Sequence, residues 1–163
     1  MPIIEVAEKY QIIRLSQPSA ADAEALTHIS KAAKAYWGYP KEWLRLWEDD
    51  LTFSADYLQA HPVFVIRSLR DDRFRGVCVL EEQLPYLWVE HLWILPEYIG
   101  QGYGTALLEH ALGTILHERH KSVKVIADPN AEPFYRARGF ETIGYHPSQP
   151  GDRQLPIMKK MMK

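Results

Sequence analysis

The segment LWILPEYIGQGYGTALLEHAL (92–112) constrains the fold of this chain more than any other stretch. A β-rich run ends at Pro96, a loop with three alternating glycines follows, and an amphipathic helix begins at once. Gly100, Gly102 and Gly104 carry no side chain, so a ligand can approach the backbone closely. The first N–H groups of the helix lack intrahelical partners, and together with the helix dipole they form a site suited to phosphate. A glycine-rich turn without a ligand is the alternative interpretation.

Two standard nucleotide-binding motifs are absent from this loop. The dinucleotide pattern GxGxxG is not met, because Thr105 stands at the sixth position counted from Gly100. The pattern GxxxxGK[ST] is not met either, because no lysine lies in the loop. The loop therefore predicts phosphate binding without either of these nucleotide folds.

The composition is that of an ordinary globular protein, with 47% hydrophobic and 25% charged residues among 163. This length predicts a single domain over residues 1–163. The one cysteine, Cys78, excludes an intramolecular disulfide and is expected to be a small buried side chain. A formal net charge of −2 argues against nucleic acid as a partner. Neither a signal peptide nor an apolar run of ~18 residues is visible, so we expect a cytoplasmic protein and no membrane partner.

The apolar periodicities predict an α/β (α+β) fold, with a mixed central sheet and helices on both faces. Strands are predicted over 11–16, 62–69, 74–82, 86–95, 123–127, 140–145 and 155–162. Helices are predicted over 18–37, 54–61, 102–118 and 131–138, with a short one around Trp43, Leu44 and Trp47. Ser19 and Asp22 are placed to cap the first helix, and Gly139 is placed to end the last one.

Two motifs in this order resemble the GNAT superfamily of acyl-CoA N-acyltransferases. PEYIGQGYG (96–104) is similar to the acyl-CoA loop of that family, whose pattern is Gln/Arg-x-x-Gly-x-Gly/Ala. NAEPFYRARGF (130–140) resembles the second motif of the family, an Asn, an aromatic pair and a closing Gly-Phe. The resemblance is strongest over 88–140, and it implies the GNAT-like fold, with a mostly antiparallel sheet, across nearly the whole chain. One departure is Ile99, which stands where the family usually has Gln or Arg.

The resemblance implies acetyl-CoA as a co-substrate and no metal ion. Backbone amides from about Gly100 to Thr105 would hold the pyrophosphate, whereas Ile99 offers no side-chain contact to it. The pantetheine arm would pair with the strand backbone around 92–94. The implied cofactor-binding residues are Leu92, Trp93, Ile94, Ile99, Gly100, Gln101, Gly102, Tyr103, Gly104, Thr105, Asn130 and Phe134. For Asn130 a helix cap is the competing interpretation.

The resemblance also implies direct transfer of the acetyl group to a primary amine in a ternary complex. An alkylammonium has a pKa of about 10.4, so a base must remove a proton before the nitrogen attacks. Glu90 is the expected base, and a paired carboxylate on the sheet face is its alternative role. His91 beside it, or water, is the other option for the base, although a packed core histidine is the favoured interpretation. Regular alternation puts these two side chains on opposite faces unless a bulge intervenes.

Tyr135 is the expected acid that protonates the leaving thiolate of CoA, because it matches the tyrosine of the second motif of the family. Core packing beside Phe134 is its alternative role. His110, His117 and His120 lie on or just beyond one predicted helix, and a metal site would need further ligands. A solvated helix end is therefore the preferred interpretation of these histidines.

The amine acceptor is not identifiable from the sequence, and small molecules and peptides are both open. An aromatic cluster, Trp37, Tyr39, Trp43 and Trp47, lies where the family usually builds its acceptor pocket. These rings could hold an ammonium group, or could simply bury the helices against the sheet. A catalytically inert CoA-binding sensor or regulatory module is the alternative function. An acyltransferase that uses a longer acyl-CoA or a hydroxyl acceptor would keep the same cofactor site. A homodimer is one option for the oligomeric state.

Overall fold

The computed structural model describes residues 8–162, which form one sheet in the order β1-β2-β3-β4-β5-β7-β6. The strands are β1 Tyr10–Arg14, β2 Val63–Ser68, β3 Phe74–Gln83, β4 Tyr86–Ile94, β5 Ser122–Ile126, β6 Glu141–Ser148 and β7 Arg153–Met161. Neighbouring strands are antiparallel except β4 and β5, which are parallel. The predicted mixed, mostly antiparallel sheet is confirmed.

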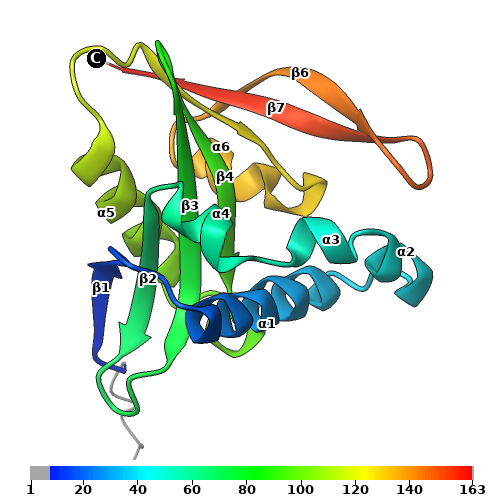
Figure 1. Cartoon of the computed structure of the whole chain (residues 1–163). Coiled ribbons are helices and arrows are strands. Elements are labelled where there is room, and N and C mark those ends of the chain that lie inside the picture. Colours follow the sequence, from blue (N-terminus) through cyan, green and yellow to red (C-terminus); the bar gives the residue numbers. More distant parts are fainter. Residues whose placement is uncertain (1–7, 163) are drawn as a thin grey trace, which may run out of the picture.

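Helices cover both faces of this sheet, as Figure 1 shows. They are α1 Ala20–Tyr36, α2 Lys41–Leu46, α3 Glu48–Leu51, α4 Ala55–Gln59, α5 Tyr103–Ile115 and α6 Glu132–Ala137. Two short 3-10 turns, Pro96–Tyr98 and Pro129–Ala131, precede α5 and α6. The sequence did not predict α3 or the 3-10 turns, which are too short for a periodic pattern. Each helix in residues 8–162 is too short or too polar to span a lipid bilayer.

Helix α1 is fixed over one face of the sheet by its cap and its apolar stripe. The Ser19 hydroxyl accepts from the N–H of Asp22, and the Asp22 carboxylate accepts from the N–H of Ser19. This capping box satisfies two N–H groups that the helix itself leaves free. Ala23, Leu26 and Ile29 are buried against β2 and β3 with side chains of α4. The predicted cap and helix are both confirmed.

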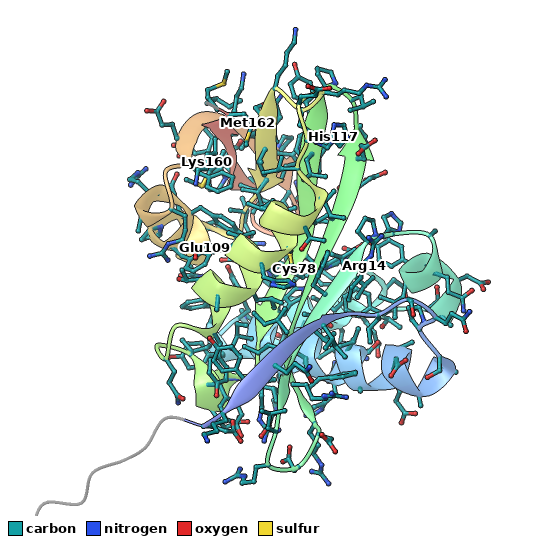
Figure 2. The ribbon with its side chains drawn as sticks, turned by 90° about the vertical axis from the view of Figure 1, so that its left-hand side faces the viewer. Arg14, Cys78, Glu109, His117, Lys160 and Met162 are labelled. Carbon is teal, nitrogen blue, oxygen red and sulfur yellow. The ribbon has the colours of Figure 1, made fainter. Side chains whose placement is uncertain are left out.

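Helices α5 and α6 bury a second apolar layer on the opposite face. Cys78 on β3 is fully buried in this layer, as predicted, and Figure 2 places it near the middle of the molecule. Burial raises the pKa of the Cys78 thiol to about 12, so the thiolate that a covalent acyl-cysteine route would need is not formed at neutral pH. The two layers together hold the middle strands β3 and β4 from both sides.

A β-bulge interrupts the pairing of β3 with β4. Val79 lies opposite His91 and Leu80 lies opposite Val89, so Glu90 is the extra residue with no partner on β3. Such an insertion shifts the in–out alternation of the strand by one residue. The β4 side chains that pack toward α5 are accordingly Leu87, Val89, Leu92 and Ile94.

This shift puts Glu90 and His91 on the same face of the sheet. Before the bulge the even-numbered residues of β4 face α1, and after it the odd-numbered residues do, as Trp93 shows by packing into the α1 layer. Regular alternation, which places the two side chains on opposite faces, is therefore wrong at this point of β4. The physical reason is the unpaired residue 90.

Candidate active site

Strands β4 and β5 lie side by side only over their first halves. Their parallel pairing runs from Tyr86 to Val89 on β4 and stops there. Beyond that point β4 continues to Ile94 along β3, whereas β5 ends at Ile126 along β7. The edge of β4 that faces β5 therefore has no strand partner over its second half, within the residues described.

A cavity of about 240 Å³ occupies the space between the two separated strands. Its walls come from β4, the end of β5, α1, the start of α5 and α6. Of the predicted site residues it is lined by Glu90, Leu92, Trp93, Ile94, Ile99, Gly104, Asn130, Phe134 and Tyr135. His91 lines it as well. Gly100, Gln101, Gly102, Tyr103 and Thr105 lie outside this cavity, in the adjoining loop and first turn of α5.

The glycine loop is shaped for a close approach by a ligand. Gly100 and Gly102 have φ of +83° and +85°, a region that residues with a side chain rarely adopt. A Cβ atom at either position would meet nothing within 4 Å, so protein packing does not account for these glycines. Gly104 differs, because a Cβ there would come within 3.4 Å of the Phe134 ring. A side chain at position 104 would thus be in ordinary van der Waals contact with α6.

The start of α5 presents unused donors beside this open space. Gly102 is the N-cap of the helix, and the N–H groups of Tyr103, Gly104 and Thr105 follow it. Within residues 8–162 no backbone carbonyl accepts a hydrogen bond from these three groups. They lie at the positive end of the helix dipole and suit an anionic group. The Tyr103 side chain plays a structural part, because its buried hydroxyl donates to Glu8 at 3.2 Å.

Glu90 has the electrostatic surroundings of a base that works near neutral pH. The Glu90 residue is exposed at the cavity, but desolvation by the surrounding protein, followed by the neighbouring Glu81 carboxyl, raises its pKa to about 7. A glutamate in water has a pKa of about 4.3, so the Glu90 carboxylate is much more basic than usual. Close to pH 7 it is partly ionised and can accept a proton from an ammonium group.

His91 is poorly suited to act as a base. Its ring packs edge-to-face against Phe53, with the centroids 4.8 Å apart, and its Nδ1 accepts a hydrogen bond from Trp93 Nε1 at 3.0 Å. Burial, and after it the nearby His61, lowers the pKa of His91 to about 4. The imidazole is therefore neutral at pH 7, in agreement with the interpretation as a packed, hydrogen-bonded histidine.

Tyr135 on α6 reaches the cavity from the layer beneath α5. It is 5% exposed, and its ring packs edge-to-face with Phe134 and Phe140 at centroid distances of 5.2 and 5.4 Å. Burial raises the pKa of Tyr135, so its hydroxyl keeps its proton at neutral pH. The residue thus combines core packing with the protonation state that an acid needs.

Asp128, just after β5, joins three distant segments at the cavity rim. Its Oδ2 accepts from Lys34 Nζ at 2.6 Å and from the Tyr39 hydroxyl at 2.9 Å, and Arg153 Nη2 lies 3.6 Å away. Burial opposes ionisation of Asp128, but these donors outweigh it and hold its pKa below the usual range. Both cations also lie over the Tyr39 and Trp47 rings, 4.6–5.0 Å from the centroids.

Two members of the aromatic cluster, Tyr39 and Trp47, therefore pack against an ion pair, and Trp47 is buried as well. Trp43 stacks on Tyr39 at 6.0 Å and covers Gly151 in the β6–β7 turn. Trp37 is the member that lines the cavity, and it is 39% exposed. A sequence pattern could not show this arrangement, because its charged members, Lys34, Asp128 and Arg153, lie far apart in the chain.

Asn130 belongs to the same network. Its Nδ2 donates to the Tyr39 hydroxyl at 3.1 Å and to Asp128 Oδ1 at 3.0 Å. Its backbone N–H donates to the same carboxylate at 2.8 Å. The residue that caps the 3-10 turn is thus Asp128, not Asn130. The side chain of Asn130 has two polar atoms. Nδ2 has the partners named above, whereas Oδ1 has no hydrogen-bond partner among residues 8–162.

The predicted solvated helix end is wrong for His120. Helix α5 ends at Ile115, and the chain then turns so that His120 is 3% exposed, with Nε2 3.0 Å from Glu82 Oε2. His117, labelled in Figure 2 near the end of the molecule that also holds Met162, lies 3.6 Å from the same carboxylate oxygen.

Glu82, His117 and His120 have possible metal-ligand atoms within 4.8 Å of one another. The hydrogen bonds of these residues nevertheless disfavour metal binding. The backbone N–H of His117 donates to Nδ1 of His120, and the backbone N–H of Arg119 donates to Nδ1 of His117, both at 3.2 Å. A neutral imidazole that accepts at Nδ1 carries its proton on Nε2. Both Nε2–H groups thus point toward Glu82, whereas a metal would need an unprotonated Nε2.

Comparison with known proteins agrees with this geometry. The model of the Acetyltransferase (GNAT) family matches residues 25–140. No curated protein matches the chain at a significant level. The PaiA N-acetyltransferase of Thermoplasma acidophilum, solved with coenzyme A, is 18% identical with a TM-score of 0.75, over 94% of this chain and 99% of that one.

Two other solved structures share this fold. A GCN5-related N-acetyltransferase from Rhodopseudomonas palustris has a TM-score of 0.74 at 18% identity, over 99% of this chain and 100% of that one. The ribosomal-protein-S18-alanine N-acetyltransferase of Escherichia coli has a TM-score of 0.66 at 18% identity, over 94% of each chain. At these identities the structures show the fold, and the family model shows the family. The chain belongs to the GNAT family of acetyltransferases, as its two motifs predict, and it is an acyltransferase.

Proposed function

We propose that this chain, as a single domain over residues 1–163, transfers the acetyl group of acetyl-CoA to a primary amine by direct attack in a ternary complex. The observation that carries the proposal is the separation of β4 from β5 next to the glycine loop. The free strand edge suits the amide groups of a pantetheine arm, in the way that an added strand pairs with a sheet edge. The N–H groups at the start of α5 suit the pyrophosphate.

The residues on either side of the cavity fit this co-substrate. Gly100 and Gly102 leave open the space that a Cβ atom would fill, and the backbone of 92–94 supplies the pairing edge. Ile99 and Phe134 add apolar walls. Ile99 cannot offer the polar side chain usual at its position, so backbone N–H groups carry the contacts to phosphate.

In this proposal Glu90 and Tyr135 move the protons. Glu90 takes a proton from the ammonium group, directly or through water, and the neutral nitrogen then attacks the thioester carbonyl carbon. As the new C–N bond forms, the C–S bond breaks, the sulfur leaves with its electron pair, and the nitrogen, cationic after the attack, gives its second proton to solvent. Tyr135 donates its hydroxyl proton to that sulfur and regains one from solvent after the reaction. Burial raises the pKa of Tyr135, so the hydroxyl holds the proton to be donated at neutral pH.

The test of this function is thiol release from acetyl-CoA with a panel of primary amines. We expect release above the rate without amine, with acetylated amine formed in equal amount. Binding of CoA with no thiol release for any amine would contradict the proposal and favour the inert CoA-binding module. The same assay with longer acyl-CoA molecules and with hydroxyl acceptors separates the remaining alternatives.

Replacement of Tyr135 by Phe is expected to lower kcat by at least about tenfold, because the leaving thiolate then takes its proton from water. The ring and its packing remain, so CoA affinity should stay within a factor of a few. Steady-state kinetics and calorimetry measure the two effects. Tyr145→Phe, the same change at an exposed tyrosine of β6, is the matched control. Wild-type turnover in the Tyr135 variant across the pH range would leave this residue a packing role only.

A further inference from the structure

We propose that His91 binds the amine acceptor through an Nε2–H donor, and so favours amines that carry a hydrogen-bond-accepting oxygen near the nitrogen. This inference rests on the proposed function and concerns the acceptor end of the same cavity. The residue would act as an acceptor-binding residue, whereas Glu90 next to it would act as the base.

The bond from Trp93 fixes which nitrogen of His91 carries the proton. An indole N–H can only donate, so His91 Nδ1 must be the acceptor in the 3.0 Å contact with Trp93 Nε1. A neutral imidazole has one proton, and it therefore lies on Nε2. Burial and the nearby His61 lower the pKa of His91 to about 4, so the neutral form with Nε2–H is the one present at neutral pH.

This Nε2–H group is available to a ligand. It forms no hydrogen bond within residues 8–162. It is also not among the side-chain atoms of that part of the chain that are fully buried without a hydrogen-bond partner. His91 lines the cavity. The ring packs edge-to-face against Phe53 and Tyr57, at centroid distances of 4.8 and 5.9 Å. These contacts and the bond from Trp93 hold the donor in a fixed orientation.

The bulge places this donor next to Glu90, on the same face of the sheet. The other titratable groups that face this point are Glu81 on β3 and Tyr57 and His61 from α4 and its end. An ammonium group has only donors, so it suits the Glu90 carboxylate and cannot bond to His91 Nε2–H. His91 requires a lone pair instead. A molecule that satisfies both neighbours has an amine and, a few bonds away, a carbonyl or hydroxyl oxygen.

The kinetic test compares glycinamide with isobutylamine, two primary amines of similar shape, of which only the first carries a carbonyl oxygen. His91→Phe keeps a ring and removes the donor. We expect it to lower kcat/KM about tenfold for glycinamide and less than about twofold for isobutylamine. Each variant is compared with the wild type for the same amine, so the different basicities of the amines cancel. His91→Gln keeps an N–H donor and should restore part of the difference.

Two further measurements keep this test independent of turnover. ¹⁵N NMR of the imidazole should show the proton on Nε2 in the wild type and a mixture of tautomers in Trp93→Phe. In the CoA complex, glycinamide should shift the His91 Nε2 resonance, and isobutylamine should not. Equal losses for both amines, or a proton on Nδ1 in the wild type, would overturn the proposal. If no amine is acetylated, the function proposed above fails, while the NMR titration still decides whether His91 recognises the oxygen.

Discussion

Replacement of Glu90 by Gln is expected to lower the rate of amine acetylation by about 10²–10⁴, the usual cost of losing a general base. The wild-type rate should fall as the pH drops through about 7, because the base must be ionised and the pKa of Glu90 is raised to about 7. The amide of Gln cannot titrate, so this acidic limb should disappear from the pH–rate profile. CoA affinity should change little, because the binding loop is untouched.

Glu81→Gln is the matched control for this experiment. The Glu81 carboxyl is one cause of the raised pKa of Glu90, so its removal should shift the acidic limb to lower pH. The part of the shift that burial causes remains, and the limb should therefore stay above the value of about 4.3 for an ordinary glutamate. A Glu90→Gln profile identical to that of the wild type would instead assign Glu90 a structural role and leave water as the base.

Replacement of Gly102 by Val is expected to weaken CoA binding at least about 100-fold. The side chain would enter the space beside the first turn of α5 that is empty in the folded protein. At least two charge-assisted hydrogen bonds to phosphate would be lost, and each contributes about 1.5–3 kcal/mol. Calorimetry with CoA measures the affinity, and circular dichroism checks the fold.

Backbone strain is the competing cause of any effect at Gly102, because its φ is +85°. Gly38 controls for it, since its φ is +80° and a Cβ there also meets nothing within 4 Å. Gly38→Val should lower the melting temperature to a similar extent and leave CoA affinity unchanged. Unchanged affinity in a folded Gly102→Val protein would mean that CoA binds elsewhere.

The parts of the site that local sequence encodes were predictable. The glycines at 100, 102 and 104 and the aromatic pair at 134–135 lie within short segments whose spacing is visible in the chain. The helix caps are local in the same sense, and the fold follows from the order of the predicted strands and helices. The C-terminal end of α5 was harder to predict from the sequence, because the turn that buries His120 depends on a contact with Glu82 on β3.

The parts that depend on long-range pairing could not be read from the sequence. The bulge at Glu90 exists only relative to the register of β3, and the separation of β4 from β5 depends on where their pairing stops. Asp128 follows a buried strand and so could have been noted as a polar residue at a strand end. Its contacts to Lys34 and Arg153 bring together residues separated by up to 119 positions, and no periodicity marks them.

The bulge in β4 also affects how this enzyme can change in evolution. Substitutions along the strand can alter the acceptor site one side chain at a time, since the backbone and the inner layers stay in place. The loss or gain of a single residue between Leu87 and Ile94 would instead exchange the two faces of half the strand, moving apolar side chains out of the α5 layer. The number of residues in this strand is therefore a constraint of its own, separate from the identity of the side chains that face the cavity.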